Sequence, residues 1–284
     1  MIPASNVAIP YDDFGGEGIT AHFAHANGYP PLAYQPLLSM LSGKFRVLAM
    51  RQRPLWTQSN PNSLKDWRLF AADLACFLDQ HRLSGIIGIG HSFGAIATLR
   101  LALQQPGRFS ALVLIDPVLF PPMMILFWNL LYKSGLGWRF HPLVRGALRR
   151  RRAFESKVAM FSNYRAKVVF NRLSDAALQA YVASLACEQT DGSVSLCYPA
   201  EWEARIYVTS MLADMEIWRN LSTLKPPVLF IRGAMTDTFW ESTAQKVKQR
   251  LPAAQVISIE NAGHLAPLEK PEAVYQAIVD FIFG

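Results

Sequence analysis

Residues 86 to 97 read Ile-Ile-Gly-Ile-Gly-His-Ser-Phe-Gly-Ala-Ile-Ala. The apolar run at the start predicts a buried strand, and the apolar residues after Gly94 predict a helix. Ser92 therefore stands at a sharp strand-to-helix turn, in a Gly-x-Ser-x-Gly pattern. Such a turn strains the backbone, and Gly90 and Gly94 leave room for it. The helix that follows directs unpaired N–H groups at the serine. An ordinary glycine-rich turn would show the same pattern, so nucleophilic chemistry also requires partners elsewhere in the chain.

Apolar strands alternate with amphipathic helices on both sides of this motif. Strands are expected at 19–25, 45–50, 85–89, 111–115, 228–231 and 255–259, and helices at 36–41, 64–81, 95–105, 242–251 and 271–283. This alternation predicts the α/β class, with a mostly parallel sheet covered by helices on both faces. Between residues 118 and 221 the alternation stops and helical segments prevail. We therefore expect a core in two parts, residues 1–117 and 222–284, with residues 118–221 inserted as a helical cap.

With these features the chain resembles the α/β-hydrolase superfamily, in which a nucleophile, an acid and a histidine follow one another along the chain. The resemblance implies Ser92 as the nucleophile and His264, in the loop after the last strand, as its base. It places the acid after strand 228–231, where Arg232-Gly-Ala-Met-Thr-Asp237 offers Asp237. Asp116 is the alternative acid, since it also closes a strand, although Asp-Pro is equally common in ordinary turns.

The resemblance also implies a mechanism of acyl transfer. His264 would accept the proton of Ser92 as the hydroxyl attacks a carbonyl carbon, and Asp237 would stabilise the charged imidazole. The backbone N–H groups of Asn27 and Phe93 would form the oxyanion hole. This chemistry requires no metal and no cofactor.

Two further histidines lie close to these residues in the sequence. His25 is expected to brace the oxyanion loop, because His25-Ala-Asn-Gly looks like the family's His-Gly-x loop with Ala26 in the glycine's place. His91 precedes the nucleophile and is interpreted as structural, since neighbours around a sharp turn do not face the same way.

The implied function is hydrolysis of carboxylic esters of hydrophobic character by a serine hydrolase. Aromatic and methionine side chains at the expected rim would line the pocket, or would form the cap's own core: Tyr29, Trp56, Phe120, Met124 and Trp128. The same triad would also suit a thioesterase, lactonase, carbon–carbon bond hydrolase, perhydrolase or acyltransferase. A ligand-binding member without activity is the alternative from another class. Ser92 excludes the haloalkane dehalogenases and epoxide hydrolases of this fold, which use a carboxylate nucleophile.

Positive charge is concentrated in one region of the chain. The net charge is +7, and the segment from Lys133 to Arg172 holds eleven Lys and Arg with Glu155 as its only acid. We interpret the run Arg149–Arg152 as a solvated helix face, with an anion-binding patch as the alternative. Contact with an anionic membrane surface is a further hypothesis. Nucleic acid is not expected, since no nucleic-acid-binding motif accompanies the basic residues.

The remaining features concern the compartment. Cys76, Cys187 and Cys197 are too few and too scattered for a disulfide framework, and none has metal-ligand spacing. The N-terminus does not resemble a signal peptide, and the apolar run 118–131 is shorter than the roughly 18 residues that span a bilayer. We therefore expect a soluble, cytoplasmic protein that acts on a small-molecule substrate.

Overall fold

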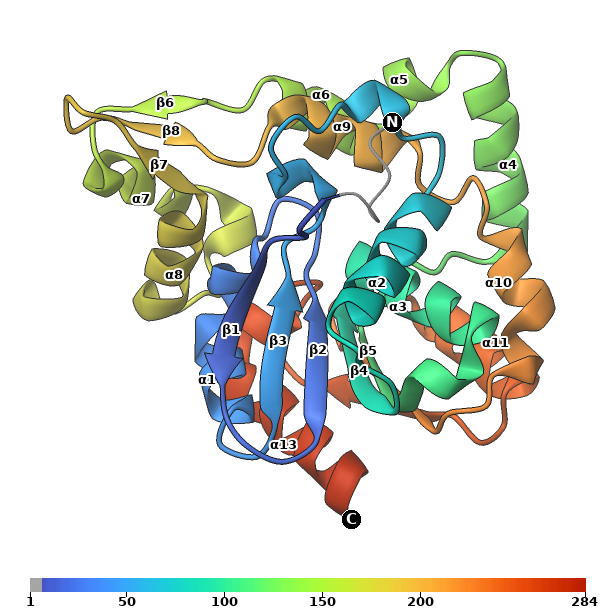
Figure 1. Cartoon of the computed structure of the whole chain (residues 1–284). Helices are drawn as coiled ribbons and strands as arrows, with labels where there is room; N and C mark the ends of the chain where they lie inside the picture. Colours follow the sequence, from blue (N-terminus) through green and yellow to red (C-terminus); the bar gives the residue numbers. More distant parts are fainter. Residues whose placement is uncertain (1–6) are drawn as a thin grey trace.

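A computed structural model describes residues 7–284 of the chain (Figure 1). Its centre is a seven-stranded sheet in the order β1-β3-β2-β4-β5-β9-β10. Only β1 runs antiparallel to its neighbour, so the predicted α/β class with a mostly parallel sheet is confirmed. The strands are β1 Tyr11–Gly15, β2 Thr20–Ala24, β3 Arg46–Met50, β4 Ile86–His91, β5 Phe109–Ile115, β9 Val228–Gly233 and β10 Gln255–Ile259.

Helices cover both faces of this sheet, as the amphipathic patterns predict. Helices α2 and α3 pack together on one face, and α1 and α13 pack together on the other (Figure 1). The core helices are α1 Gln35–Leu41, α2 Arg68–Gln80, α3 Phe93–Gln104, α11 Glu241–Arg250, α12 Ala266–Glu269 and α13 Pro271–Phe283. The edge strand β1 was not predicted, because all five of its residues are partly or fully exposed and it lacks an apolar pattern.

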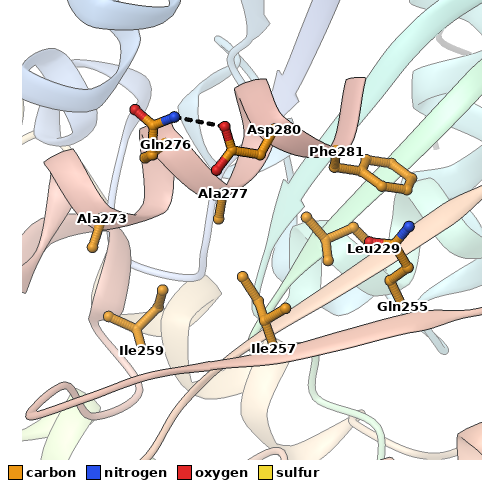
Figure 2. Close-up of a pocket in the computed structure, with 9 residues that line it drawn as sticks. All are labelled: Leu229, Gln255, Ile257, Ile259, Ala273, Gln276, Ala277, Asp280 and Phe281. Carbon is orange, nitrogen blue, oxygen red and sulfur yellow. Dashed lines mark hydrogen bonds between the residues drawn. The ribbon is translucent and has the colours of Figure 1, made fainter. Parts of the chain in front are cut away.

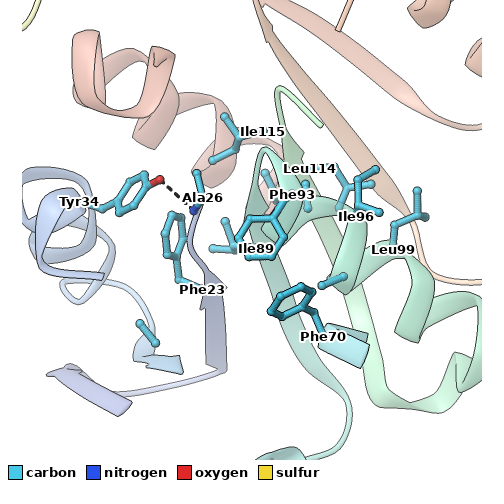
Figure 3. Packing of buried hydrophobic residues seen from close by; sticks show 14 of the residues in the cluster. Phe23, Ala26, Tyr34, Phe70, Ile89, Phe93, Ile96, Leu99, Leu114 and Ile115 are labelled. Carbon is cyan, nitrogen blue, oxygen red and sulfur yellow. Dashed lines mark hydrogen bonds between the residues drawn. The ribbon is translucent and has the colours of Figure 1, made fainter. Parts of the chain in front are cut away.

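The strand β4 and the helix α3 lie at the middle of the core. Every residue of β4 is buried, and so are the first ten residues of α3. Figure 3 shows the ring of Phe93 packed among side chains from neighbouring strands and from α2. The ring lies 4.9 Å from that of Phe70, edge to face. The turn that carries Ser92 is thus fixed by the apolar contacts of the next residue, Phe93.

Between β5 and β9 the chain leaves the main sheet, and much of this segment lies above the carboxyl ends of the strands (Figure 1); we call the segment the cap. Its helices are α4 Pro122–Lys133, α5 Gly137–Phe140, α6 Pro142–Leu148, α7 Lys157–Arg165, α8 Asp175–Leu185, α9 Ala200–Val208 and α10 Met215–Asn220. It also holds a small antiparallel sheet, in the order β6-β8-β7, formed by Ala153–Phe154, Val194–Leu196 and Ala186–Glu188. These strands span two or three residues, too few to show a period of two in the sequence.

The structure corrects the expectation for the cysteines. Cys187 on β7 and Cys197 just after β8 form a disulfide, with Cα atoms 5.3 Å apart, and Cys76 is free. The ten-residue separation gave no sign of pairing, because only the turn between β7 and β8 brings the two residues together. The scarcity of cysteines is therefore no argument for a reducing compartment. In the part of the chain that the structure describes, no helix combines the length and apolar character needed to cross a bilayer.

Candidate active site

Ser92 occupies the turn between β4 and α3 in a strained conformation. Its φ of 58° and ψ of −121° lie outside the regions that a serine ordinarily adopts. Its own N–H donates to the carbonyl oxygen of Ile115 at 2.9 Å. A Cβ atom on Gly94 would lie 2.3 Å from the carbonyl oxygen of Ala24, and one on Gly90 would lie 2.6 Å from Cα of Ala95. Both glycines are therefore required by close backbone approach.

Two hydrogen bonds connect Ser92 with a histidine and a carboxylate. Nε2 of His264 lies 2.9 Å from Oγ of Ser92, and Nδ1 of His264 lies 2.9 Å from Oδ1 of Asp116. The side chain of Asp116 is fully buried, and that of His264 is about a quarter exposed. This is the geometry in which an imidazole accepts a hydroxyl proton on one side and is oriented by a carboxylate on the other.

The expectation that Asp237 would face His264 is wrong. Asp237 is exposed, and its Oδ1 accepts a hydrogen bond from the hydroxyl of Thr238 at 3.1 Å. The loop after β9 instead encloses Asp116, with the N–H of Gly233 at 2.9 Å and the hydroxyl of Thr236 at 2.7 Å donating to its carboxylate. The loop after β9 was expected to supply the acid. It instead supplies hydrogen-bond donors to Asp116, the acid that follows the neighbouring strand β5.

The position of Asp116 follows from the order of the strands. β5 lies between β4 and β9, so its end is adjacent to the turn of Ser92. Asp116 also has a positive φ of 41°, a conformation that Asp tolerates better than most residues and that clusters at functional sites. Asp116-Pro117 directly after an apolar strand was the sequence signal, and an ordinary turn gives the same signal.

His25 braces the loop that should provide part of the oxyanion hole. Its Nδ1 donates to the carbonyl oxygen of Ala26 at 2.8 Å, and its Nε2 accepts from the N–H of Gln52 at 3.0 Å. Burial lowers the pKa of His25 to about 4, so the ring is neutral, as these two bonds require. The hydroxyl of Tyr34 also accepts from the N–H of Ala26 at 3.1 Å (Figure 3). The loop is thus held by bonds on both of its sides.

Asn27 and Phe93 lie on two segments whose backbones approach each other closely, at Ala24 and Gly94. Phe93 is the first residue of α3, so its N–H has no acceptor within the helix. Asn27 is buried in the turn directly after β2. The structure therefore brings both residues to the end of the sheet where Ser92 lies, and their role as donors to an oxyanion stays a prediction.

The cap holds the side chain of Asn27 at both ends. Its Nδ2 donates to the carbonyl oxygen of Glu203 on α9 at 3.0 Å, and its Oδ1 accepts from the hydroxyl of Tyr198 at 2.9 Å. Burial raises the pKa of Tyr198 well above its usual value of 10.0, which keeps this hydroxyl protonated as a donor. Sequence reasoning missed these two residues, since both lie more than 170 positions from Asn27.

One residue of the arginine run is not solvated. Nη1 of Arg150 donates to the carboxylate of Glu203 at 2.7 Å, and Nη2 donates to the hydroxyl of Tyr181 at 2.5 Å. The side chain of Arg150 is only 9% exposed, and its Nη1 would lie 3.6 Å from a Cβ on Gly28. The expectation of a solvated helix face is therefore wrong for Arg150. Arg149, Arg151 and Arg152 are exposed, but they follow the end of α6 and are not helical.

The expected pocket residues lie in different surroundings. The ring of Tyr29 lies 4.9 Å from that of Tyr181, that of Phe120 lies 5.6 Å from that of Trp240, and Met124 is half-buried against the core. Trp128 is buried on α4 with its ring 5.0 Å from that of His141. Their contact with a substrate stays a prediction.

Trp56 is the exception among these residues, because it lines a separate hollow. This hollow has a volume of about 160 Å³ and is also lined by Arg53, Ser59 and Asn60. Figure 2 shows a wider groove of about 470 Å³ between β10 and α13, lined by Ile257 and Ala277 among others. That groove includes no residue of the triad. Within residues 7–284, no group of three or more His, Cys, Asp or Glu side chains is arranged to hold a metal ion.

Comparison with known proteins shows the family and the fold of the chain. A family model described as the alpha/beta hydrolase family matches residues 23–277. N-formylmaleamate deformylase of Pseudomonas putida is 23% identical over 99% of this chain and 95% of its own length. Esterase YbfF of Escherichia coli is 24% identical over 73% of this chain and 71% of its own length. The crystal structure of E-2-(acetamidomethylene)succinate hydrolase superposes with a TM-score of 0.79 at 19% identity, covering 100% of this chain and 98% of the other.

Proposed function

Since this chain belongs to the alpha/beta hydrolase family, we propose that it is a serine hydrolase that cleaves carboxylic esters through an acyl-enzyme on Ser92. The carrying observation is the pair of 2.9 Å contacts that joins Ser92 to His264 and His264 to Asp116. A serine hydroxyl alone is a poor nucleophile, and in this arrangement Nε2 of His264 can accept its proton.

The reaction would proceed in two halves. Oγ of Ser92 attacks the ester carbonyl carbon while Nε2 of His264 takes the hydroxyl proton, and Asp116 accepts the Nδ1–H of the resulting imidazolium. The N–H groups of Phe93 and Asn27 stabilise the oxyanion, and each such donor contributes about 10² to 10³ in rate. His264 then returns the proton to the departing alcohol. Water activated by the same imidazole attacks the acyl-enzyme and frees Ser92.

We expect a substrate with an apolar acyl part, because an apolar helix follows the strand end that carries Asp116. Trp128 and Ile125 form the buried face of α4, which begins six residues after Asp116. Polar side chains lie over the oxyanion loop, where Arg150, Glu203 and Tyr198 form what we call the polar wall. We therefore expect an ester whose apolar side faces α4 and whose more polar side faces α9.

Amide cleavage is the second candidate, and one observation favours it. The relative that matches 99% of this chain is a deformylase by name, and removing a formyl group from an amide uses the same triad. The polar wall around Arg150 suits a small polar amide better than a long acyl chain. The two candidates differ in their leaving group and in the size of the acyl part.

The deciding experiment is hydrolysis of p-nitrophenyl esters from acetate to long acyl chains, beside N-formyl and N-acetyl amides. The native protein should hydrolyse one of the two series, and Ser92→Ala should lower kcat by about 10⁴ to 10⁶. Ser39→Ala, which alters an exposed serine on α1, is the matched control and should retain full activity.

Labelling with a fluorophosphonate separates the remaining alternatives. The native protein should be labelled at Ser92, and Ser92→Ala should not be labelled. A folded protein that neither hydrolyses any ester or amide nor reacts with the probe would contradict the proposal, and the ligand-binding alternative would replace it. Transfer of the acyl group to an added alcohol in preference to water would instead identify an acyltransferase.

A further inference from the structure

The cap helix α4 has two apolar faces. Its buried face carries Ile125 and Trp128. Its opposite face carries four apolar side chains that are between 52% and 75% exposed: Met123, Leu126, Phe127 and Leu130. These positions follow the spacing i, i+3, i+4, i+7, so they form one continuous stripe along the helix. A helix on the surface of a water-soluble domain normally carries polar residues on this face.

Exposed apolar side chains continue beyond α4 into the next two helices. Phe140 closes α5 and is 59% exposed, and Leu143 at the start of α6 is 52% exposed. Figure 1 shows α4 at the outer edge of the cap, with α5 at its upper end and α6 beyond it. We name the exposed side chains of residues 123–149 the outer cap surface.

The charges of this surface are of one sign. Lys133 lies three residues after Leu130, so it stands at the end of the apolar stripe on the same face of the helix. Arg139, Arg145 and Arg149 are exposed on the segments that follow. Residues 118–152 contain no Asp or Glu. Within residues 7–284, none of these four cations lies within ion-pair distance of a carboxylate, whereas the neighbouring Arg150 and Arg152 are paired with Glu203 and Glu201.

We propose that the outer cap surface binds an anionic lipid surface, with the α4 stripe entering the interface and these cations against the headgroups. An apolar helix face flanked by Lys and Arg is the arrangement by which helices lie in the plane of a membrane. Each cation near such a surface adds attraction that salt screens.

Charge also argues against a second copy of the chain as the occupant. A two-fold interface places the same patch of both subunits in contact. The four unpaired cations of one copy would then face those of the other, without a carboxylate from residues 118–152 to neutralise them. An anionic lipid surface supplies the missing negative charge.

The test is co-sedimentation of the full chain with vesicles of phosphatidylcholine alone and with about 30% phosphatidylglycerol. We expect binding to the anionic vesicles at low salt. Binding should fall at least tenfold on neutral vesicles, and again in about 0.5 M NaCl.

Variants separate the two components of the surface. Phe127→Asp with Leu130→Asp should lower the affinity for anionic vesicles at least tenfold, and Arg139→Glu with Arg145→Glu should do the same. The matched control is Val168→Asp with Val169→Asp, which alters two exposed valines of the 3₁₀ turn Val168–Phe170 between α7 and α8. It should bind as the native protein does. Vesicle binding is compared only between variants whose melting temperatures match that of the native protein.

Three outcomes would overturn the proposal. The first is no binding to anionic vesicles at low salt. The second is binding that the Phe127 and Leu130 variant leaves unchanged. The third is a dimer in sedimentation velocity that this variant dissociates while vesicle binding is absent, which would assign the surface to a second copy.

Discussion

Nε2 of His91 lies 2.8 Å from the backbone carbonyl oxygen of His264. His91, which precedes the nucleophile Ser92, therefore fixes the backbone of the catalytic histidine. A carbonyl oxygen only accepts, so this nitrogen carries a proton. Burial lowers the pKa of His91 well below its usual value of 6.5, and the ring is neutral. Its Nδ1 therefore accepts, from the hydroxyl of Tyr34 at 2.8 Å. Since Tyr34 also accepts from Ala26, one line of bonds joins the oxyanion loop, the nucleophile turn and the His264 loop.

Tyr34→Phe should interrupt this line. The change leaves Nδ1 of His91 and the N–H of Ala26 without partners in the core, which should lower the free energy of unfolding by about 1 to 3 kcal/mol. Because both catalytic loops lose a tether, kcat should fall while KM stays near its native value. Urea unfolding and ester kinetics measure the two effects, with Tyr275→Phe on α13 as the control. A loss of stability with unchanged kcat would show that Tyr34 acts only in the fold.

Asp116→Asn and Asp237→Asn distinguish the two carboxylates. Asp116→Asn removes the charge that stabilises the imidazolium of His264 and should lower kcat by about 10⁴. Asp237→Asn alters an exposed side chain and should change kcat by no more than roughly twofold. Steady-state kinetics on the best ester compares the variants. The reverse ranking would mean that the loop after β9 rearranges when substrate binds.

Tyr198→Phe tests whether the cap positions the oxyanion hole. The substitution removes one of the two bonds that hold the side chain of Asn27, so the N–H of Asn27 should be less well fixed. We expect a fall in kcat of about tenfold to a hundredfold, less than the loss of the donor itself. Tyr164→Phe removes another cap hydroxyl, which bonds Arg150 and not Asn27, and serves as the control. Equal effects of the two variants on kcat would contradict a specific role for Tyr198.

Buried histidines should make stability depend on pH, and His22 and His25 serve as examples. Burial lowers the pKa of His22 to about 3 and that of His25 to about 4, from 6.5 in the unfolded chain. Below pH 6.5 the unfolded state therefore takes up protons that the folded state does not, and stability falls as pH decreases toward 4. Each histidine contributes about 1.4 kcal/mol per pH unit in this window. Urea unfolding between pH 7 and 4 should show this slope, and it should be shallower for His22→Gln. An equal slope in both proteins would contradict the assignment.

The Cys187–Cys197 bond should be detectable by its chemistry. Titration with a thiol reagent in denaturant should find one free thiol, that of Cys76. Cys187→Ser with Cys197→Ser should lower the free energy of unfolding by about 2 to 3 kcal/mol, as expected for a short closed loop. Three free thiols in the unreduced protein would show that the bond does not form in solution.

The sequence was sufficient where a pattern is local, and insufficient where neighbours are set by the fold. The run from Ile86 to Ala97 specifies a strand, a strained turn and a helix, and the loop of His264 follows the last strand. The partner of His264 depends on which strand lies beside β4, and no local pattern records that Asp116 is nearer than Asp237. Arg150 shows the same limit, since Glu203 and Tyr181, distant in sequence, remove it from solvent.

The glycine contacts beneath the triad also determine where the molecule can open. Gly94 touches the carbonyl groups at the end of β2, and a Cβ on Gly233 would lie 2.1 Å from the carbonyl oxygen of Gly263. These contacts join backbone to backbone, so no side chain can change rotamer to relieve them. The segments beneath the triad therefore move as one body. Any widening of the site must therefore come from the cap above these segments and not from the segments themselves. Where release of a product needs such widening, the speed of the cap sets the rate of turnover.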